Sequence, residues 1–126
     1  MSGSLPVLDV RSPSEFKQGH IPGATSYPLF DDAERAEVGT LYKKLGQPQA
    51  VERGLEIVST KMKDLFQKGV SYGKEGKLLV HCWRGGKRSE SVASLLAVSG
   101  LDIYVLIGGY KAYRNWVLEQ FQGNIQ

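Results

Sequence analysis

Short apolar runs alternate with stretches of helical spacing along this chain. Val7–Val10, Lys77–His81 and Ile103–Ile107 are short and apolar, so each predicts a strand, and a brief extended piece is expected at Thr25–Tyr27. The β-branched run Ile103–Ile107 is predicted to be a central strand, like Lys77–His81. Strands that alternate with helices favour an α/β fold with a mostly parallel central sheet and helices on both faces.

Helix start signals follow the first predicted strand. Ser12 can cap a short helix that has Pro13 at its first position and Glu15 as the third-residue partner. Gly19–Ala24 contains two glycines and a proline, which is typical of a turn. The polar segment Asp31–Arg35 predicts one capped helical turn.

A longer helical pattern begins at Gln47. Apolar residues recur there at spacings of four, three, four and three, which predicts one face of a long helix: Val51, Leu55, Val58, Met62 and Leu65. This helix is expected to end at Gly69. A further helix is predicted over Ser89–Ser99, and a last helix after Gly108-Gly109 carries Tyr110, Tyr113, Val117 and Phe121.

Length and composition predict one domain, residues 1–126, with a single core. The only cysteine, Cys82, cannot form an internal disulfide, and the first residues lack a basic segment followed by a long apolar one. No apolar run approaches the roughly 20 residues that span a bilayer. We therefore expect a cytoplasmic protein without membrane contact.

Charge is distributed unevenly along the sequence. Residues 1–37 contain three basic and six acidic residues, whereas the rest contains thirteen basic and seven acidic ones. A basic balance suits a small anionic substrate or RNA, but this excess is also ordinary for a protein surface. The sequence shows no RNA-binding signature such as an RNP aromatic run.

The candidate chemistry lies in the segment that follows the predicted strand Lys77–His81. In a parallel sheet, ligands bind beyond the carboxyl ends of the strands, which is where Cys82 falls. The next residues are those of a tight anion-binding loop that opens a helix: Trp83, Arg84, Gly85, Gly86, Lys87, Arg88 and Ser89. Backbone N–H groups, a helix N-terminus and three cations would each lower the pKa of Cys82.

A lone cysteine is more often a small buried apolar residue than a nucleophile. Two glycines and three cations within six residues of Cys82 favour a reactive thiolate instead. Without a second cysteine, a dithiol redox motif and a cysteine zinc site are excluded within this chain. We expect neither a metal site nor a cofactor.

Two protein families share the sequence pattern around Cys82. His81-Cys82, five residues and then Arg88-Ser89 match the HC-x5-R-[ST] signature of cysteine-dependent phosphatases, and the seven-residue span from Cys82 to Arg88 is the length of Cdc25-type loops. Other segments resemble the rhodanese family across nearly the whole chain: Asp9-Val10-Arg11, Glu15-Phe16, Gly19-His20-Ile21-Pro22-Gly23-Ala24 and Gly108-Gly109. The rhodanese resemblance implies a rhodanese-like fold and sulfur transfer through Cys82.

Within that family, the chain is most similar to the rhodanese domain of the tRNA 2-selenouridine synthases. The similarity includes Pro28-Leu29-Phe30, Glu34-Arg35, Tyr42, Cys82-Trp83-Arg84-Gly85-Gly86 and Gly109-Tyr110-Lys111 with Arg114. It implies that Cys82 carries sulfur or selenium while a wobble 2-thiouridine becomes 2-selenouridine. Those enzymes have a second, P-loop domain, but no G-x-x-x-x-G-K-[ST] motif is present here. The implied partners are a small anionic sulfur or selenium donor and, through the missing domain, tRNA.

Three alternatives stay open: a stand-alone thiosulfate sulfurtransferase, a Cdc25-type phosphatase and an inactive rhodanese-type module. In the favoured hypothesis, Cys82 attacks the donor, Arg84 and Arg88 hold its anion, and Lys87 steers it. Trp83 is expected to pack in the loop, with base stacking as the alternative. Supporting roles are assigned to Asp9, Arg11 and Glu15, the last two either pairing with each other or bracing the loop. His81 should face away from Cys82.

Overall fold

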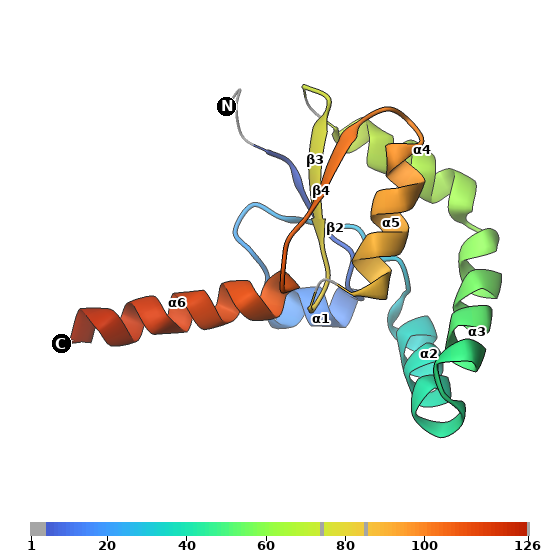
Figure 1. The fold of residues 1–126 in the computed structure, drawn as a ribbon, viewed down its shortest axis with the longest axis horizontal. Helices are drawn as coiled ribbons and strands as arrows, with labels where there is room; N and C mark the ends of the chain where they lie inside the picture. The colour runs from blue at the N-terminus through green and yellow to red at the C-terminus, as the bar shows by residue number, and fades with distance from the viewer. Residues whose placement is uncertain (1–4, 74, 85, 126) are drawn as a thin grey trace.

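Among the residues that the structure describes, four parallel strands form the centre of the molecule and six helices surround or extend from them (Figure 1). The computed structural model describes residues 5–73, 75–84 and 86–125, with the backbone alone described for 121–125. Along the chain the elements are β1 (Val7–Asp9), α1 (Pro13–Gln18), β2 (Thr25–Ser26), α2 (Asp32–Leu45), α3 (Gln47–Ser59), α4 (Met62–Tyr72), β3 (Lys77–His81), α5 (Lys87–Ala97), β4 (Asp102–Val105) and α6 (Gly109–Ile125).

The order of the strands in the sheet creates a crevice between β1 and β3. The order is β2-β1-β3-β4, and every pairing is parallel. The chain leaves β1 toward one edge of the sheet and leaves β3 toward the other. Because parallel crossovers are right-handed, α1 lies on the face opposite α4 and α5, so the loops after β1 and β3 diverge. In open parallel sheets, ligands bind at such switch points. The prediction of an α/β fold with a mostly parallel sheet is confirmed.

The core lies between the sheet and the helices α4 and α5. Alternate strand residues point into it, and Leu8, Val10, Leu78 and Val80 are fully buried. They belong to one apolar cluster with Val92 and Leu96 of α5 and Leu65 of α4. The Tyr27 hydroxyl donates a hydrogen bond to the Leu65 carbonyl, which ties the end of β2 to α4.

The helix after Asp31 is longer than the single turn predicted from the sequence. Asp31 caps α2, because its side chain accepts from the Glu34 N–H at 2.7 Å while Glu34 accepts from the Asp31 N–H at 2.9 Å. The helix then continues for 14 residues. Its polar surface gives little apolar periodicity, so contact with α3 rather than a buried stripe stabilises it.

The predicted long helix from Gln47 is wrong in two respects. It is divided at Thr60 and Lys61 into α3 and α4, and only part of its predicted apolar face is buried. Leu65 lies in the core and Val58 packs against it, whereas Val51, Leu55 and Met62 are exposed. The buried residues of α3 are instead Ala50, Gly54 and Ile57. Phe30 packs so close to Gly54 that a Cβ there would lie 3.3 Å from its ring.

Gly69 does not end α4, as the sequence suggested, but lies inside it. A Cβ at this position would come within 2.9 Å of Leu96 and Tyr27 side-chain atoms. The glycine is therefore a packing residue that lets α4 approach the core, and the helix continues to Tyr72.

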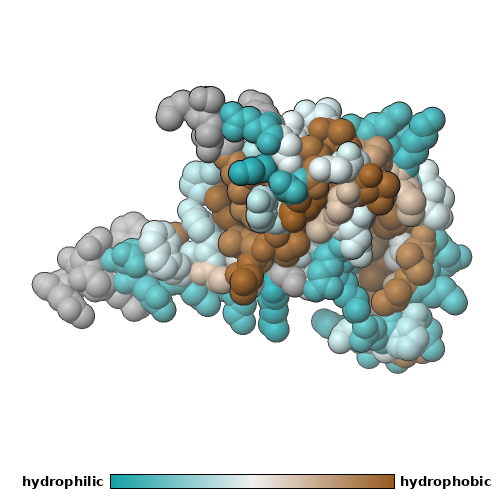
Figure 2. Space-filling model, turned by 45° about the horizontal axis from the view of Figure 1, so that its top comes forward, coloured by the Kyte–Doolittle hydropathy of each residue, from teal (hydrophilic) through white to brown (hydrophobic). Residues whose placement is uncertain are grey.

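The last helix is found where it was predicted, after Gly108, but the last strand differs from expectation. β4 is an edge strand rather than a central one, and Ile107 beyond its end is 90 % exposed. An edge strand still needs apolar residues where it packs on α5, so its composition resembles that of a central strand. Figure 2 shows apolar side chains reaching the surface of the body, whereas the coloured part of α6 is mostly polar. α6 points away from the sheet (Figure 1). Among the described residues, no helix is long and apolar enough to cross a membrane.

Candidate functional site

Cys82 follows β3 directly, at the carboxyl edge of the sheet, and is 3 % exposed. The Gly86 N–H donates to its Sγ at 3.3 Å. The thiol donates to the Ser89 Oγ at 3.2 Å, and the Ser89 hydroxyl in turn donates to the Gly86 carbonyl at 3.1 Å. Because α5 begins at Lys87, the sulfur lies at the positive end of a helix.

Opposing effects act on the ionisation of this thiol. Burial raises the pKa of Cys82, whereas hydrogen bonds from Ser89, the Gly86 N–H and the charge of Arg88 lower it, and the balance is a lowered pKa. The direction is the one expected from the sequence. A larger fraction of the thiol is therefore the nucleophilic thiolate at neutral pH than in an ordinary cysteine.

The N-terminus of α6 holds the backbone of the same loop. The N–H groups of Tyr110 and Lys111 donate to the carbonyls of Cys82 and Trp83, at 2.8 and 2.9 Å. Gly109 has a left-handed φ of 58°, and a Cβ there would lie only 2.4 Å from the Cys82 carbonyl oxygen. These hydrogen bonds hold the two carbonyls against the start of α6, and the close approach requires glycine at 109.

Arg88 is held by α1. Its guanidinium donates to both carboxylate oxygens of Glu15, at 2.7 and 3.3 Å, and Glu15 also accepts from the Ser12 N–H and hydroxyl. Burial raises the pKa of Glu15, but the hydrogen bonds and charge of Arg88 outweigh it and, with Ser12, lower the pKa to about 2. Glu15 thus braces the loop, as one of the two sequence alternatives proposed.

The other alternative, a pair between Arg11 and Glu15, is wrong. Arg11 donates to both oxygens of Asp9, at 2.7 to 3.2 Å, and to the Gly19 carbonyl at 2.8 Å. The four-residue spacing does not bring Arg11 and Glu15 together because Arg11 precedes α1, which begins at Pro13. Arg11 also stacks on the Tyr110 ring at 4.2 Å, so it joins β1 to α6.

His81 lies on the side of β3 where Asp9 and Tyr110 are found. Its Nδ1 is 3.2 Å from the Cys82 carbonyl oxygen, and its Nε2 is 3.7 Å from Asp9. Burial lowers the pKa of His81, and the nearby charge of Asp9 opposes this only in part. The ring is fully buried and neutral, in keeping with a structural role.

The remaining loop residues lie around the mouth of the site. Arg84 and Lys87 are exposed, and Trp83 is half-buried. Gly85, which the sequence assigns to the anion loop, lies outside the described residues. Among the residues that the structure describes, no group of His, Cys, Asp and Glu could hold a metal ion.

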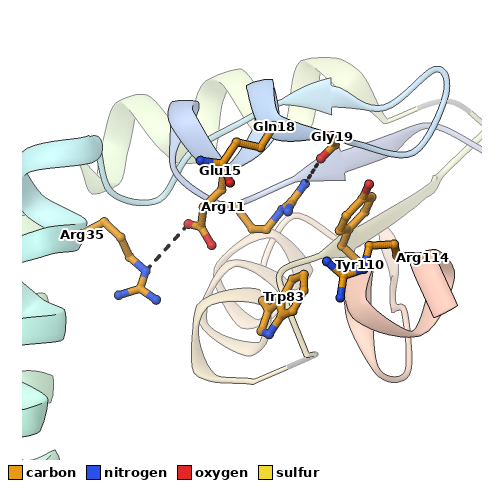
Figure 3. Close-up of a pocket in the computed structure, with 8 residues that line it drawn as sticks. All are labelled: Arg11, Glu15, Gln18, Gly19, Arg35, Trp83, Tyr110 and Arg114. Carbon is orange, nitrogen blue, oxygen red and sulfur yellow. Dashed lines mark hydrogen bonds and ion pairs between the residues drawn. The ribbon is translucent and has the colours of Figure 1, made fainter.

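A groove of about 420 Å³ opens beside the loop (Figure 3). Its lining comes from α1, α2, α6 and the loop: Arg11, Glu15, Gln18, Gly19, Arg35, Trp83, Tyr110 and Arg114. Arg35, Tyr110 and Arg114 were not among the predicted site residues. For the two α6 residues a signal existed, since Gly108-Gly109 follows a strand parallel to β3 and must reach the same edge of the sheet.

Curated relatives match nearly the whole chain but are much longer. A tRNA 2-selenouridine synthase from Bdellovibrio bacteriovorus is 40 % identical over 94 % of this chain and 32 % of its own length. The synthase of Nitrosomonas europaea is 39 % identical over 90 % of this chain and 30 % of its own. The chain therefore spans about a third of the length of these relatives.

Solved structures agree with the fold. The N-terminal domain of a Clostridium difficile 630 protein is 40 % identical, with a TM-score of 0.84 over 90 % of this chain and 89 % of that one. A rhodanese-related protein from Thermoplasma volcanium, 21 % identical with a TM-score of 0.50 over 88 % and 77 % of the two chains, shows the fold alone. The family described as Rhodanese-like domain matches residues 1–115. The chain belongs to the rhodanese-like domain family.

Proposed function

We propose that this domain transfers sulfur or selenium through a covalent intermediate on Cys82. The observation that carries the proposal is the stabilised sulfur at the start of α5, with its contacts to Gly86 and Ser89. With thiosulfate as donor, the thiolate attacks the outer sulfur, the S–S bond of the donor breaks, and sulfite leaves with the electron pair. A Cys82 persulfide forms. With selenosulfate the thiolate attacks selenium, the Se–S bond breaks, sulfite again leaves with the electron pair, and a Cys82 selenylsulfide forms.

We further propose that the acceptor is the wobble 2-thiouridine of a tRNA, which becomes 2-selenouridine. The support is the similarity to two tRNA 2-selenouridine synthases at 39–40 % identity. The domain would supply the chalcogen-carrying cysteine of such an enzyme. The remaining two-thirds of the length of these relatives would supply the other steps.

The surroundings of the loop favour this reaction over phosphate ester hydrolysis. A phosphatase of the HC-x5-R type needs its arginine for phosphate, whereas the Arg88 donors are directed at Glu15. The same pair does not favour the expected contact of Arg88 with the anion of a sulfur donor, for which the exposed Arg84 and Lys87 are available. A phosphatase also needs an acid for the leaving group, and the two aspartates considered for that role are engaged. Asp31 caps α2 and Asp32 accepts from the Ser14 N–H.

Mass spectrometry of the protein after incubation with thiosulfate tests the proposed reaction. We expect Cys82 to gain the mass of one sulfur atom, and cyanide to remove it as thiocyanate. The Cys82→Ser variant should show neither signal. An aryl phosphate assay on the same protein serves as the counter-test. Phosphate release without sulfur loading would overturn the proposal.

A further inference from the structure

A second hollow adjoins the groove whose lining is drawn in Figure 3. This hollow, of about 510 Å³, lies between α1 and α2 and ends at Thr40 and Lys43. Glu15 and Arg35 line both hollows, so the two meet there. The result is a groove that runs from the start of α6, past the mouth of the cysteine loop, to the surface of α2.

Aromatic and guanidinium groups are concentrated at the α6 end of this groove. Arg114 lies over the Trp83 ring at 5.0 Å, and the Tyr110 ring centre is 6.2 Å from that of Trp83. An indole ring can stack on a nucleobase as well as on a guanidinium, because the base and the guanidinium are both planar, delocalised groups. Since Trp83 belongs to the loop that carries Cys82, a base stacked on it lies at the outer edge of that loop.

Cations outnumber carboxylates along the groove. Glu15 forms a short ion pair with Arg88 and a longer one, 3.7 Å, with Arg35 Nε, which makes no hydrogen bond to any residue that the structure describes. The two hollows are lined by four cations, Arg11, Arg35, Lys43 and Arg114, and by two carboxylates, Glu15 and Asp32. Cations spread over two helices suit a chain of phosphates better than one small anion.

We propose that this groove binds a single strand of RNA, with a base on Trp83 and the phosphates on Arg114, Arg35 and Lys43. The inference rests on the proposed function, and it assigns an acceptor site to residues of this domain. The base replaces the Arg114 guanidinium over the indole, and the exposed arginine turns to the adjacent phosphate. Stacking then places the base at the mouth of the Cys82 loop.

Binding of a short uridine-rich RNA oligonucleotide to the 126-residue chain tests the proposal. In a Trp116→Phe background, Trp83 is the remaining tryptophan, so the RNA should quench its fluorescence directly. Three phosphate contacts predict that log K falls with log salt with a slope of about −2. Uridine monophosphate should bind more weakly than the oligonucleotide. Equal affinity for the two, or no binding of either, would overturn the proposal.

Matched variants locate the binding site. Measured by fluorescence anisotropy of a labelled RNA, Trp83→Leu should weaken binding about tenfold or more through lost stacking. Arg114→Ala should weaken binding and reduce the magnitude of the salt slope by about 0.7. Trp116→Leu on α6 and Arg53→Ala on α3 lie outside the groove lining and should bind as the unmodified protein does. Equal losses in these two controls would contradict the assignment.

Cys82→Ser separates this inference from the proposed function. Cys82 does not line the groove, so the serine variant should bind RNA normally although it cannot carry sulfur. RNA binding without sulfur loading of the unmodified protein would leave the groove in place and refute the proposed function. Sulfur loading without RNA binding would support the proposed function and refute RNA binding in the groove.

Discussion

Two helices begin beside the Cys82 loop, and they act on different atoms. At the start of α5, the Gly86 N–H donates to the sulfur itself. At the start of α6, two N–H groups donate instead to the carbonyls of Cys82 and Trp83. The first contact stabilises the charge that changes during the reaction, and the second fixes the backbone. The ionisation of the sulfur and the shape of the loop are thus controlled from separate helices.

Gly86, at the start of α5, and Gly109, at the start of α6, differ in how much space surrounds them. No heavy atom lies within 4 Å of a Cβ built on Gly86, whose φ is −99°. A Cβ on Gly109 would overlap the carbonyl groups of Cys82 and Trp83. Glycine is therefore sterically required at the start of α6, where the backbone is held, and not at the start of α5.

The largest expected effect is that of Gly109→Ala. The left-handed backbone alone costs about 1–2 kcal/mol with an alanine, and the overlap with Cys82 and Trp83 adds to it. We expect the free energy of unfolding to fall by roughly 2 kcal/mol or more, as measured by urea denaturation. Gly86→Ala is the matched control, with an expected change within about 0.5 kcal/mol. Equal losses in the two variants would remove the distinction between the helices.

The next effect concerns the brace between α1 and the loop. Glu15→Gln breaks a hydrogen-bonded ion pair with Arg88, so we expect a loss of roughly 2 kcal/mol in unfolding free energy at pH 7. The folded pKa of Glu15 is lowered to about 2, below its ordinary value of 4.5. This stability is therefore present above pH 4.5 and is lost as the pH falls toward 2.

Denaturation of Glu15→Gln and the unmodified protein over this pH range checks the sign. Their difference should shrink as the pH falls from 4.5, and a difference independent of pH would contradict the assignment. Glu37→Gln is the control, because Glu37 and Arg53 form an exposed ion pair. Such pairs contribute no more than about 1 kcal/mol.

A smaller effect is expected for Ser89 of α5, on the ionisation of Cys82. In the ionised form the Ser89 hydroxyl can turn and donate to the sulfur, so Ser89→Ala removes a hydrogen bond that favours the thiolate and should raise the pKa of Cys82. The pH dependence of alkylation by iodoacetamide measures this, since Cys82 is the single cysteine. Ser91→Ala, on an exposed position of α5, should leave the midpoint unchanged. An unchanged midpoint in Ser89→Ala would exclude Ser89 from the ionisation of Cys82.

The strands and the cysteine loop were predictable because their signals are local. The apolar run before Cys82 and the capping residues Ser12 and Glu15 gave correct elements at nearly correct bounds. The burial of α3 was not predictable from large apolar residues, since it depends on how closely Phe30 approaches Gly54. Contact distance is a tertiary property, and the sequence pattern does not contain it.

In the candidate site, too, contacts within one loop were predictable and contacts between distant segments were not. Cys82 and Ser89 lie together as expected because one loop carries both. The partners of Arg11 and Arg88 could not be chosen from spacing, because Glu15 reaches a residue 73 positions away. Arg35 of the groove was missed, since α2 meets the loop only in the folded chain, and Arg114 could have been placed only from the parallel pairing of β3 with β4.

The central claim is that the fold holds Cys82 as a reactive thiolate. The most direct measurement is the rate of Cys82 alkylation as a function of pH, in the folded protein and in the same protein unfolded in urea. The unfolded chain should give a midpoint near the ordinary value of about 8.5. We predict a lower midpoint in the folded protein, the direction in which the loop shifts the pKa of Cys82. A folded midpoint equal to or above that of the unfolded chain would contradict the account.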